Sequence, residues 1–261
     1  MCLGLMEEEW DVAIILDACR YDTFKEVYRK YLPKGKLEKR IGANETLDWL
    51  KKNFNDYHDV VYISGHPGIN SFGIPWGGFN ARDKFHKVID VWLSGWSDEL
   101  NTTLPSMVSN TLIKTYKKMK KRVIAHYMQP HIPYRLKPYK IEFFNGRKNI
   151  IGRIIENVKY LKILIQRANN LIKHGYIVGH ETEIELYYFK NFSVKDLLNL
   201  YTDNLRWVLE SVKDVVNRIK GRRIVITSDH GEAFGEKRMF FHPFNNNNPV
   251  IRIVPFLVIE T

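Results

Sequence analysis

The sequence predicts an α/β fold with three layers, α/β/α, built around a mainly parallel central sheet. Two observations predict it: short apolar, β-branched runs recur along the chain, and helical patterns lie between them. Strands that alternate with helices form a parallel sheet whose two faces are both covered. Each run is bounded by polar or turn residues, as buried strands are. The expected strands are residues 12–16, 60–64, 88–93, 122–127, 224–227 and 251–259.

The clearest helical pattern begins after Ser193. Ser193 can cap this helix, and Asp196 at the third position completes a capping box. Apolar residues then recur at helical spacing up to Ile219, and Gly221 ends the helix directly before a strand. A second helix starts at Pro105, because a first-turn proline forfeits no hydrogen bond. The other expected helices are residues 22–31 and 47–54, and the helix from Pro105 runs to residue 118.

Composition and length favour one folded unit. The chain has 261 residues, 44% of them hydrophobic and 13% aromatic, so it can bury a full core. This composition excludes general disorder. No internal repeat or low-complexity linker divides the chain. We therefore expect a single domain over residues 1–261, with a basic insertion or lid at about 135–191 over the carboxyl edge of the sheet.

The charge balance predicts an anionic partner. Lys and Arg number 40 against 29 Asp and Glu, a formal net charge of +11. Between residues 135 and 173 there are ten basic side chains and two acidic ones. This segment could track nucleic-acid phosphates, but its apolar residues follow a helical stripe, so its lysines most simply form the solvated face of a helix. Nucleic-acid binding is therefore kept as an alternative and is not the expected function.

Cysteine usage and hydropathy predict a cytoplasmic protein. The two cysteines, Cys2 and Cys19, cannot make a disulfide framework or a four-thiolate zinc site. The N-terminal residues lack the basic and apolar regions of a secretory signal. The apolar runs are shorter than the roughly 20 residues of a membrane-spanning helix. We expect no membrane span, and the oligomeric state is not predicted.

Polar side chains follow three of the apolar runs directly. In open α/β sheets, ligands bind at the carboxyl ends of the strands, so these side chains are the first candidates for a site. The three segments are Asp17-Ala-Cys-Arg20-Tyr-Asp22, His126-Tyr-Met-Gln-Pro-His131-Ile-Pro-Tyr134 and Asp229-His230-Gly231-Glu232, the last followed by His242.

Asp17, Asp229 and His230 predict a divalent-metal site. Carboxylate oxygens and a neutral imidazole suit zinc or manganese and, with fewer nitrogens, magnesium. For Asp17 alone the alternative is a helix cap. The Asp229-His230 pair is a sharper signal because the glycine after it permits a tight turn under an ion.

These three segments, in this order, resemble the sulfatase-like branch of the alkaline phosphatase superfamily. The resemblance covers about residues 11–257 and rests mainly on Ser-Asp229-His230-Gly-Glu232. It implies an alkaline-phosphatase-like fold, with Asp17, Asp229 and His230 as metal ligands. It also implies that His131 hydrogen-bonds a non-bridging oxygen of the transferred phosphoryl or sulfuryl group.

The resemblance places a nucleophile at a helix N-terminus downstream of the first strand, and Thr46 is the residue that matches. A metal lowers the pKa of such a hydroxyl, and the free N–H groups of the helix stabilise the developing anion. The alternative for Thr46 is an ordinary N-cap. His242 is a candidate substrate or metal contact, with simple packing as its alternative. Arg20 is a candidate substrate contact, but a structural pairing with Asp22 is the favoured alternative.

Departures from the family narrow the reaction. The chain lacks the Cys-x-Pro-x-Arg context of formylglycine sulfatases, and Ala18 stands where many sulfatases have a second aspartate. The two-metal relatives add an Asp-x-x-x-His pair near the middle of the chain, where this sequence has only His131. One metal, manganese or zinc, is therefore expected, with magnesium and calcium as alternatives, and a second ion would need His242 and another ligand. The resemblance is strongest to single-metal members with a threonine nucleophile. It implies a metal-dependent hydrolase or transferase that acts on a phosphate mono- or diester through a phosphothreonine intermediate.

Two other hypotheses about the function stay open. One is a sulfatase-type sulfuric ester hydrolase, and the other is a non-catalytic or nucleic-acid-binding protein. The substrate is expected to be an anionic phosphorylated or sulfated small molecule or glycan. His126, in an apolar strand, is expected to be a core histidine. Glu232 is expected to anchor backbone N–H groups, and His66 has no assigned role.

Overall fold

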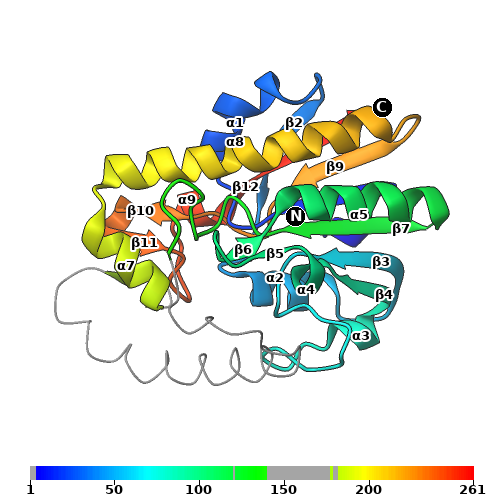
Figure 1. Ribbon diagram of the computed structural model, residues 1–261, viewed down its shortest axis with the longest axis horizontal. Coiled ribbons are helices and arrows are strands. Elements are labelled where there is room, and N and C mark those ends of the chain that lie inside the picture. Colours follow the sequence, from blue (N-terminus) through cyan, green and yellow to red (C-terminus); the bar gives the residue numbers. More distant parts are fainter. Residues whose placement is uncertain (1–3, 120, 140–176, 179–181) are drawn as a thin grey trace.

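The computed structural model of the chain describes residues 4–119, 121–139, 177–178 and 182–261. A seven-stranded sheet forms the middle of three layers, in the order β2-β12-β9-β1-β7-β3-β4 (Figure 1). This architecture confirms the predicted α/β/α class. The strands are β1 (Val12–Leu16), β2 (Lys36–Ile41), β3 (His58–Ser64), β4 (Phe85–Asp90), β7 (Arg122–Tyr127), β9 (Arg223–Thr227) and β12 (Ile253–Glu260).

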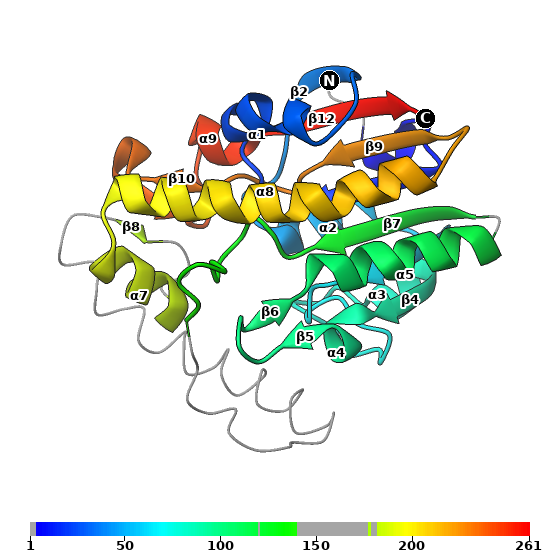
Figure 2. The same cartoon turned by 45° about the horizontal axis from the view of Figure 1, so that its top comes forward.

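The sheet is mainly parallel, as predicted. β1 lies at its centre, parallel to β7 on one side and to β9 on the other, so that Val12 is opposite both Val123 and Ile224. β12 is the exception, since it runs antiparallel to β9 and to β2. In Figure 2 the arrowheads of β7 and β9 point to one end of the molecule and that of β12 points to the other. The parallel strands therefore end together at one edge.

Helices cover both faces, and β1 supplies each face with alternate side chains. Val12, Ile14 and Leu16 pack in one core with apolar residues of α8. Ala13 and Ile15 pack in the other core with residues of α2. A strand buried on both faces has no polar positions, which explains its unbroken apolar run. The first core also receives α1 (Tyr21–Val27) and α5 (Pro105–Lys118); α8 is Val194–Arg218 and α2 is Thr46–Asn53.

The best predicted elements are those with strong local signals. β1, β7 and α5 have the expected bounds. Ser193 caps α8 through the expected box, accepting from the Asp196 N–H. The prediction of a strand at residues 88–93 was shifted, because β4 ends at Asp90 and α4 (Val91–Ser94) follows. The last strand starts later than predicted, since α9 (Pro249–Arg252) occupies its expected beginning.

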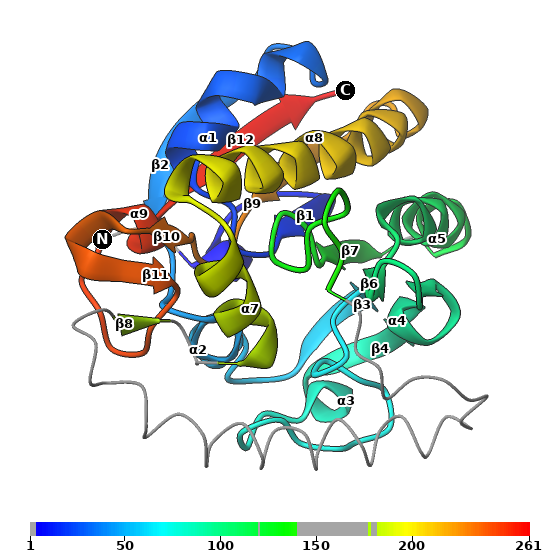
Figure 3. The ribbon, with the colours of Figure 1, turned by 60° about the vertical axis from the view of Figure 1, so that its left-hand side comes forward.

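A smaller layer lies beyond the carboxyl ends of the parallel strands. It contains a three-stranded sheet and the helix α7, as Figure 3 shows. Aromatic side chains form its core, among them Tyr134, Tyr188 and Phe234. The elements of this layer are β8 (Ile177–Val178), α7 (Glu183–Asn191), β10 (Ala233–Phe234) and β11 (Met239–Phe241). Elsewhere, the remaining described elements are α3 (Ala81–Lys84), β5 (Trp96–Ser97), β6 (Thr102–Thr103) and three short 3-10 helices.

Most of the predicted basic insertion, and the apolar stripe within it, lies outside the described residues. Its described parts are residues 135–139, β8 and α7, so the extent of a lid and the single-domain boundary stay predictions. No helix within the described ranges combines the length and apolar character needed to cross a bilayer.

Candidate active site

The carboxyl ends of β1 and β9 bring the three predicted metal ligands together. Asp17 directly follows β1, and Asp229 and His230 follow β9, its parallel neighbour. His230 Nε2 lies 3.4 Å from Asp17 Oδ1 and 3.6 Å from Asp229 Oδ2. All three side chains are buried. The prediction that sequence-distant segments meet at this edge agrees with the geometry.

Thr46 joins this group from the first turn of α2. Its hydroxyl donates a hydrogen bond to Asp229 Oδ2 at 2.7 Å, and its oxygen lies 3.5 Å from His230 Nε2. The N-cap of α2 is Glu45, so Thr46 is the first helical residue and its side chain does not cap the helix. The hydroxyl therefore sits at the positive end of α2, where free N–H groups favour an anion.

Backbone contacts fix the loop that carries Thr46. The Gly42 N–H donates to the Arg252 carbonyl and the Ala43 N–H to the Asp229 carbonyl, each at 2.8 Å. A Cβ at Gly42 would lie 2.7 Å from that Asp229 oxygen. A side chain at residue 42 would clash with the Asp229 backbone, so glycine is required where the loop that carries Thr46 passes the Asp229 segment.

Glycine is required at residue 231 for close packing, and not for the tight turn under an ion that the sequence predicted. A Cβ at Gly231 would meet the Val250 carbonyl oxygen at 2.1 Å, and its N–H donates to the Ile251 carbonyl at 2.6 Å. Its φ is not positive, so the glycine is required by close packing against the start of α9 and not by the turn itself. The unusual turn is instead at Ala18, with φ 58°, whose N–H donates to Asp229 Oδ1 at 3.2 Å.

The electrostatics of the group fit a cation. Burial opposes ionisation of Asp17, but the charges of His131 and His230 hold its pKa below the ordinary value. Burial likewise disfavours the charged form of His230, but Asp229 and Asp17 together raise its pKa to about 10. A protonated imidazole thus offsets only one of the two buried carboxylates in this group. A buried negative charge of this kind needs a compensating positive one.

The unpaired atoms also fit a metal. Asp17 Oδ1 is buried and no described residue gives it a hydrogen bond. His230 Nδ1 lies 2.9 Å from the Gly231 carbonyl, which can only accept, so Nδ1 carries the hydrogen. A metal ion bound between the carboxylates would take the place of the Nε2 proton, so that the Nε2 lone pair would face the ion. This is the usual arrangement of a metal-binding histidine.

His126 belongs to the same group, although the sequence pattern pointed to the core. It lies near the end of β7 and is fully buried, as expected. Its Nε2 lies 3.9 Å from Asp229 Oδ2, and Asp17, His126 and Asp229 each offer one ligand atom within 4.8 Å of the others. Burial lowers the pKa of His126 and keeps the ring neutral. One feature could have indicated that His126 belongs to the site: it lies one residue before the end of β7, the strand that pairs with β1.

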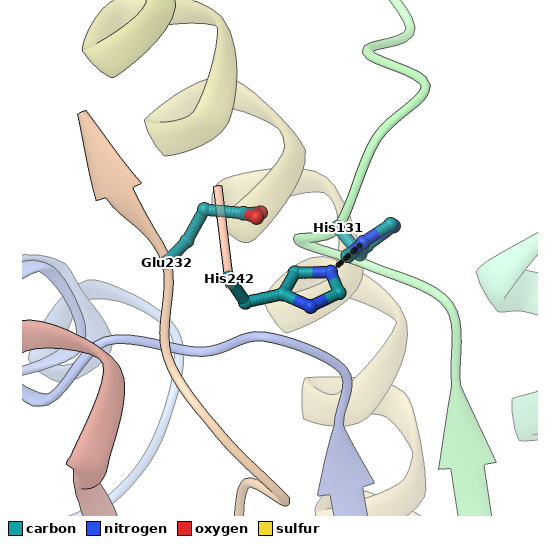
Figure 4. Close-up of side chains that lie close together, drawn as sticks. All are labelled: His131, Glu232 and His242. Carbon is teal, nitrogen blue, oxygen red and sulfur yellow. Dashed lines mark hydrogen bonds between the residues drawn. The ribbon is translucent and has the colours of Figure 1, made fainter. Parts of the chain in front are cut away.

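A second group of side chains lies beside the first. His131, Glu232 and His242 each offer one ligand atom within 4.8 Å of the others (Figure 4). The two histidines are joined through their Nε2 atoms at 2.9 Å, and His131 Nδ1 donates to the Ile132 carbonyl at 2.8 Å. Burial lowers the pKa of His131, but Glu232 and Asp17 outweigh it and raise the pKa. The group can bind anionic oxygens or a cation.

The expectation for Glu232 was wrong. Both carboxylate oxygens are buried, and no described residue hydrogen-bonds them, so this side chain anchors no backbone N–H. Burial raises the pKa of Glu232 to about 7, although the positive charges of His131 and His230 oppose the rise. The side chain instead faces the two histidines (Figure 4).

Arg20 is engaged by protein groups. Its guanidinium donates to Asp22 at 2.6 and 2.9 Å, to Glu236 at 2.7 Å and to the Glu232 carbonyl at 3.2 Å. The geometry favours the structural alternative, in which Arg20 ties the loop after β1 to the loop after β9. His66 stacks on Trp76 with ring centroids 4.7 Å apart, and it lies 6.2 Å from the His126 ring.

Asn204 of α8 holds the loop that carries His131. Its side chain is fully buried and donates to the carbonyls of His131 at 3.2 Å and Pro133 at 3.0 Å. It also accepts from the Arg135 N–H at 2.9 Å. Sequence reasoning missed this residue, because a polar residue within a helical pattern gives no indication of its tertiary partners.

Replacing Asn204 with leucine is expected to destabilise the fold by about 2–4 kcal/mol, because buried carbonyl and N–H groups lose their partners. Urea unfolding monitored by fluorescence measures the change. The control is Thr202→Val, since the Thr202 hydroxyl donates to the Leu198 carbonyl of its own helix and to no other residue within the described ranges. A free energy of unfolding equal to that of the control would show that Asn204 does not hold the loop.

Comparison with known proteins places the fold. No family model and no curated protein matches the chain. Solved structures do match. The soluble domain of lipooligosaccharide phosphoethanolamine transferase A from Neisseria meningitidis has a TM-score of 0.57 and 14% identity, over 95% of this chain and 75% of that one. The periplasmic domain of EcEptC from Escherichia coli, in complex with zinc, has a TM-score of 0.57 and 12% identity, over 99% and 75%.

This chain has an alkaline-phosphatase-like fold. A Bacteroides thetaiotaomicron protein assigned as a sulfatase supports the same conclusion, with a TM-score of 0.50 and 11% identity over 97% of this chain and 65% of that one. The structural neighbours thus include phosphoethanolamine transferases and a protein assigned as a sulfatase. At these identities the likeness concerns the alkaline-phosphatase-like fold alone.

Proposed function

We propose that the protein is a metal-dependent enzyme that acts on phosphate esters, as a hydrolase or a transferase, with Thr46 as its nucleophile. The observation that carries the proposal is the position of the Thr46 hydroxyl. It lies at the N-terminus of α2, within hydrogen-bond distance of Asp229 and beside His230. The enzymes among the structural neighbours support the class of reaction.

Asp17, Asp229 and His230 would hold the metal, with the Thr46 oxygen next to them. Such an ion supplies Lewis acidity to the phosphoryl oxygens and lowers the pKa of a bound hydroxyl. Mixed oxygen and nitrogen donors favour manganese or zinc over magnesium or calcium. The zinc complex of the E. coli neighbour supports a divalent metal.

Thr46 and Asp229 would carry out the transfer of the phosphoryl group to the enzyme. The hydrogen of Thr46 Oγ1 points to Asp229 Oδ2, which accepts the proton as Oγ1 attacks phosphorus. A bond forms between Oγ1 and phosphorus while the bond to the leaving oxygen breaks, and that oxygen departs with the bonding electron pair and takes up a proton from water. The product on the enzyme is phosphothreonine, which water or an acceptor hydroxyl cleaves. The positive end of α2 stabilises the developing negative charge.

His131 and His242 would bind the non-bridging oxygens of the phosphoryl group. Their Nε2 atoms face one another beside the metal ligands, and the raised pKa of His131 favours the form that donates from both ring nitrogens. Arg20 is not included in this role, because carboxylate and carbonyl groups already occupy its guanidinium.

The substrate is proposed to be an anionic phosphorylated small molecule or glycan, in keeping with the net charge of +11. A sulfate ester is the second candidate, supported by the structural neighbour that is assigned as a sulfatase. The nucleic-acid alternative depended on residues 135–173, most of which lie outside the described residues. A cytoplasmic location stays a prediction from sequence, although the E. coli neighbour is a periplasmic domain.

Parallel assays test the reaction class. p-Nitrophenyl phosphate, bis-p-nitrophenyl phosphate and p-nitrophenyl sulfate would be incubated with protein loaded with manganese, zinc, magnesium or calcium, and with chelator-treated protein as the control. We expect metal-dependent release from a phosphate ester that exceeds release from the sulfate. Faster release from the sulfate would favour the sulfatase alternative. No release from any ester with any ion would count against an esterase.

A further inference from the structure

Tyr62 and His126 form a buried hydrogen-bonded pair beneath the candidate metal site. The Tyr62 hydroxyl lies 2.7 Å from His126 Nδ1, and both side chains are fully buried. They come from adjacent parallel strands, β3 and β7. This bond leaves His126 Nε2 as the ring nitrogen that faces the site.

The other ring nitrogen of His126 has no hydrogen-bond partner in the described part of the chain. His126 Nε2 is buried, and none of the described residues hydrogen-bonds it. It lies 3.9 Å from Asp229 Oδ2, and it groups with Asp17 and Asp229 within 4.8 Å. A buried nitrogen without a partner is costly. Its direction toward two carboxylates indicates that its partner is something those carboxylates also bind.

Tautomer chemistry connects the two observations. An imidazole nitrogen binds a metal through its lone pair, so the hydrogen of a neutral ring must then be on the opposite nitrogen. That hydrogen needs an acceptor, and the Tyr62 oxygen is in reach. Partners of this kind fix the ring orientation of metal-binding histidines.

We propose that Tyr62 is a positioning residue: it accepts the Nδ1–H of His126 and so turns the Nε2 lone pair toward Asp17 and Asp229, which makes His126 an additional ligand of the metal. This inference rests on the proposed function, because it assumes that the site holds a metal. With His126 and His230 the donor set contains two imidazoles, which favours zinc or manganese further over magnesium and calcium.

Zinc affinity of the Tyr62→Phe variant tests the pairing. Phenylalanine keeps the ring and removes the acceptor, so zinc should bind about 10–100-fold more weakly, as when other partners of ligand histidines are removed. Competition with a chromophoric chelator measures the affinity. The matched control is Tyr127→Phe: Tyr127 is fully buried, and its hydroxyl pairs with Ser109 at 2.9 Å in the other core. The control should bind zinc as the parent does.

A double-mutant cycle separates positioning from general packing. His126→Gln should weaken zinc binding at least as much as Tyr62→Phe, and the double variant should bind no worse than His126→Gln alone, since Tyr62 acts only through His126. In the zinc-loaded parent, long-range ¹H–¹⁵N spectra should show hydrogen on Nδ1 of His126 and none on Nε2. The His126→Gln spectrum assigns those signals.

The outcomes distinguish this inference from the proposed function. Parent-like zinc affinity in Tyr62→Phe, additive losses in the double variant, or hydrogen on Nε2 in the zinc-loaded parent would each overturn the role of Tyr62 and leave the proposed function intact. A parent protein that binds neither zinc nor manganese would overturn both.

Discussion

Asp229→Ala is expected to leave the chain without bound metal and to reduce phosphate-ester turnover by roughly 10⁴-fold or more. Asp229 Oδ2 accepts from the Thr46 hydroxyl at 2.7 Å and lies 3.6 Å from His230 Nε2, so one carboxylate would serve both the proposed nucleophile and the proposed metal. Elemental analysis after dialysis and steady-state assays measure the two effects. About one ion per chain is expected in the parent.

Two further variants separate charge from folding. Asp229→Asn keeps the size of the side chain and an acceptor for the Ala18 N–H, yet it should lose metal and activity almost as fully. Asp214→Ala removes an exposed carboxylate that pairs with Arg218 on the surface of α8, and it should change neither quantity. Parent levels of metal and turnover in Asp229→Asn would refute the assignment of this carboxylate.

Thr46→Ala should also abolish turnover, by about 10³-fold or more, but for a different reason. The variant keeps Asp17, Asp229 and His230, so it should still bind metal, with weakened affinity at most. It lacks the hydroxyl oxygen that we propose attacks phosphorus. Rates under saturating metal measure the loss, and peptide mass spectrometry of the parent should detect phosphate on Thr46 during turnover.

Thr46→Ser is the matched control, because it restores a hydroxyl at the first position of α2. It should recover a measurable part of the parental rate, whereas Thr46→Val, which is closer in shape, should not. Equal activity in Thr46→Ala and the parent, with metal bound in both, would remove Thr46 from the reaction.

The sheet could be predicted where both faces of a strand are buried. β1, and the Val-Ile-Ala stretch of β7, consist of apolar residues because helices cover both faces of the sheet at these strands. The sequence shows these apolar runs directly. β2 could not be found, since it is the charged edge strand Lys36–Ile41 and its side chains are largely exposed. β4, the other edge, was misplaced for the same reason. Edge strands carry charges that resemble a loop in sequence.

The candidate site could be predicted where residues follow buried strands. Asp17, Asp229 and His230 are such residues, and the parallel order of β1 and β9 brings them together. The contacts of Tyr62 and of Asn204 could not be predicted, because their hydrogen-bond partners are remote in sequence. Apolar spacing tells which face of a strand or helix is buried, but not which polar atom a buried hydroxyl or amide meets.

The most direct test is a crystal structure of the protein soaked with zinc or manganese, with an anomalous difference map collected at the absorption edge of the metal. We predict a peak between Asp17, Asp229 and His230, within bonding distance of those side chains and next to the Thr46 oxygen. No peak there, or a peak only among His131, Glu232 and His242, would contradict the proposed active site.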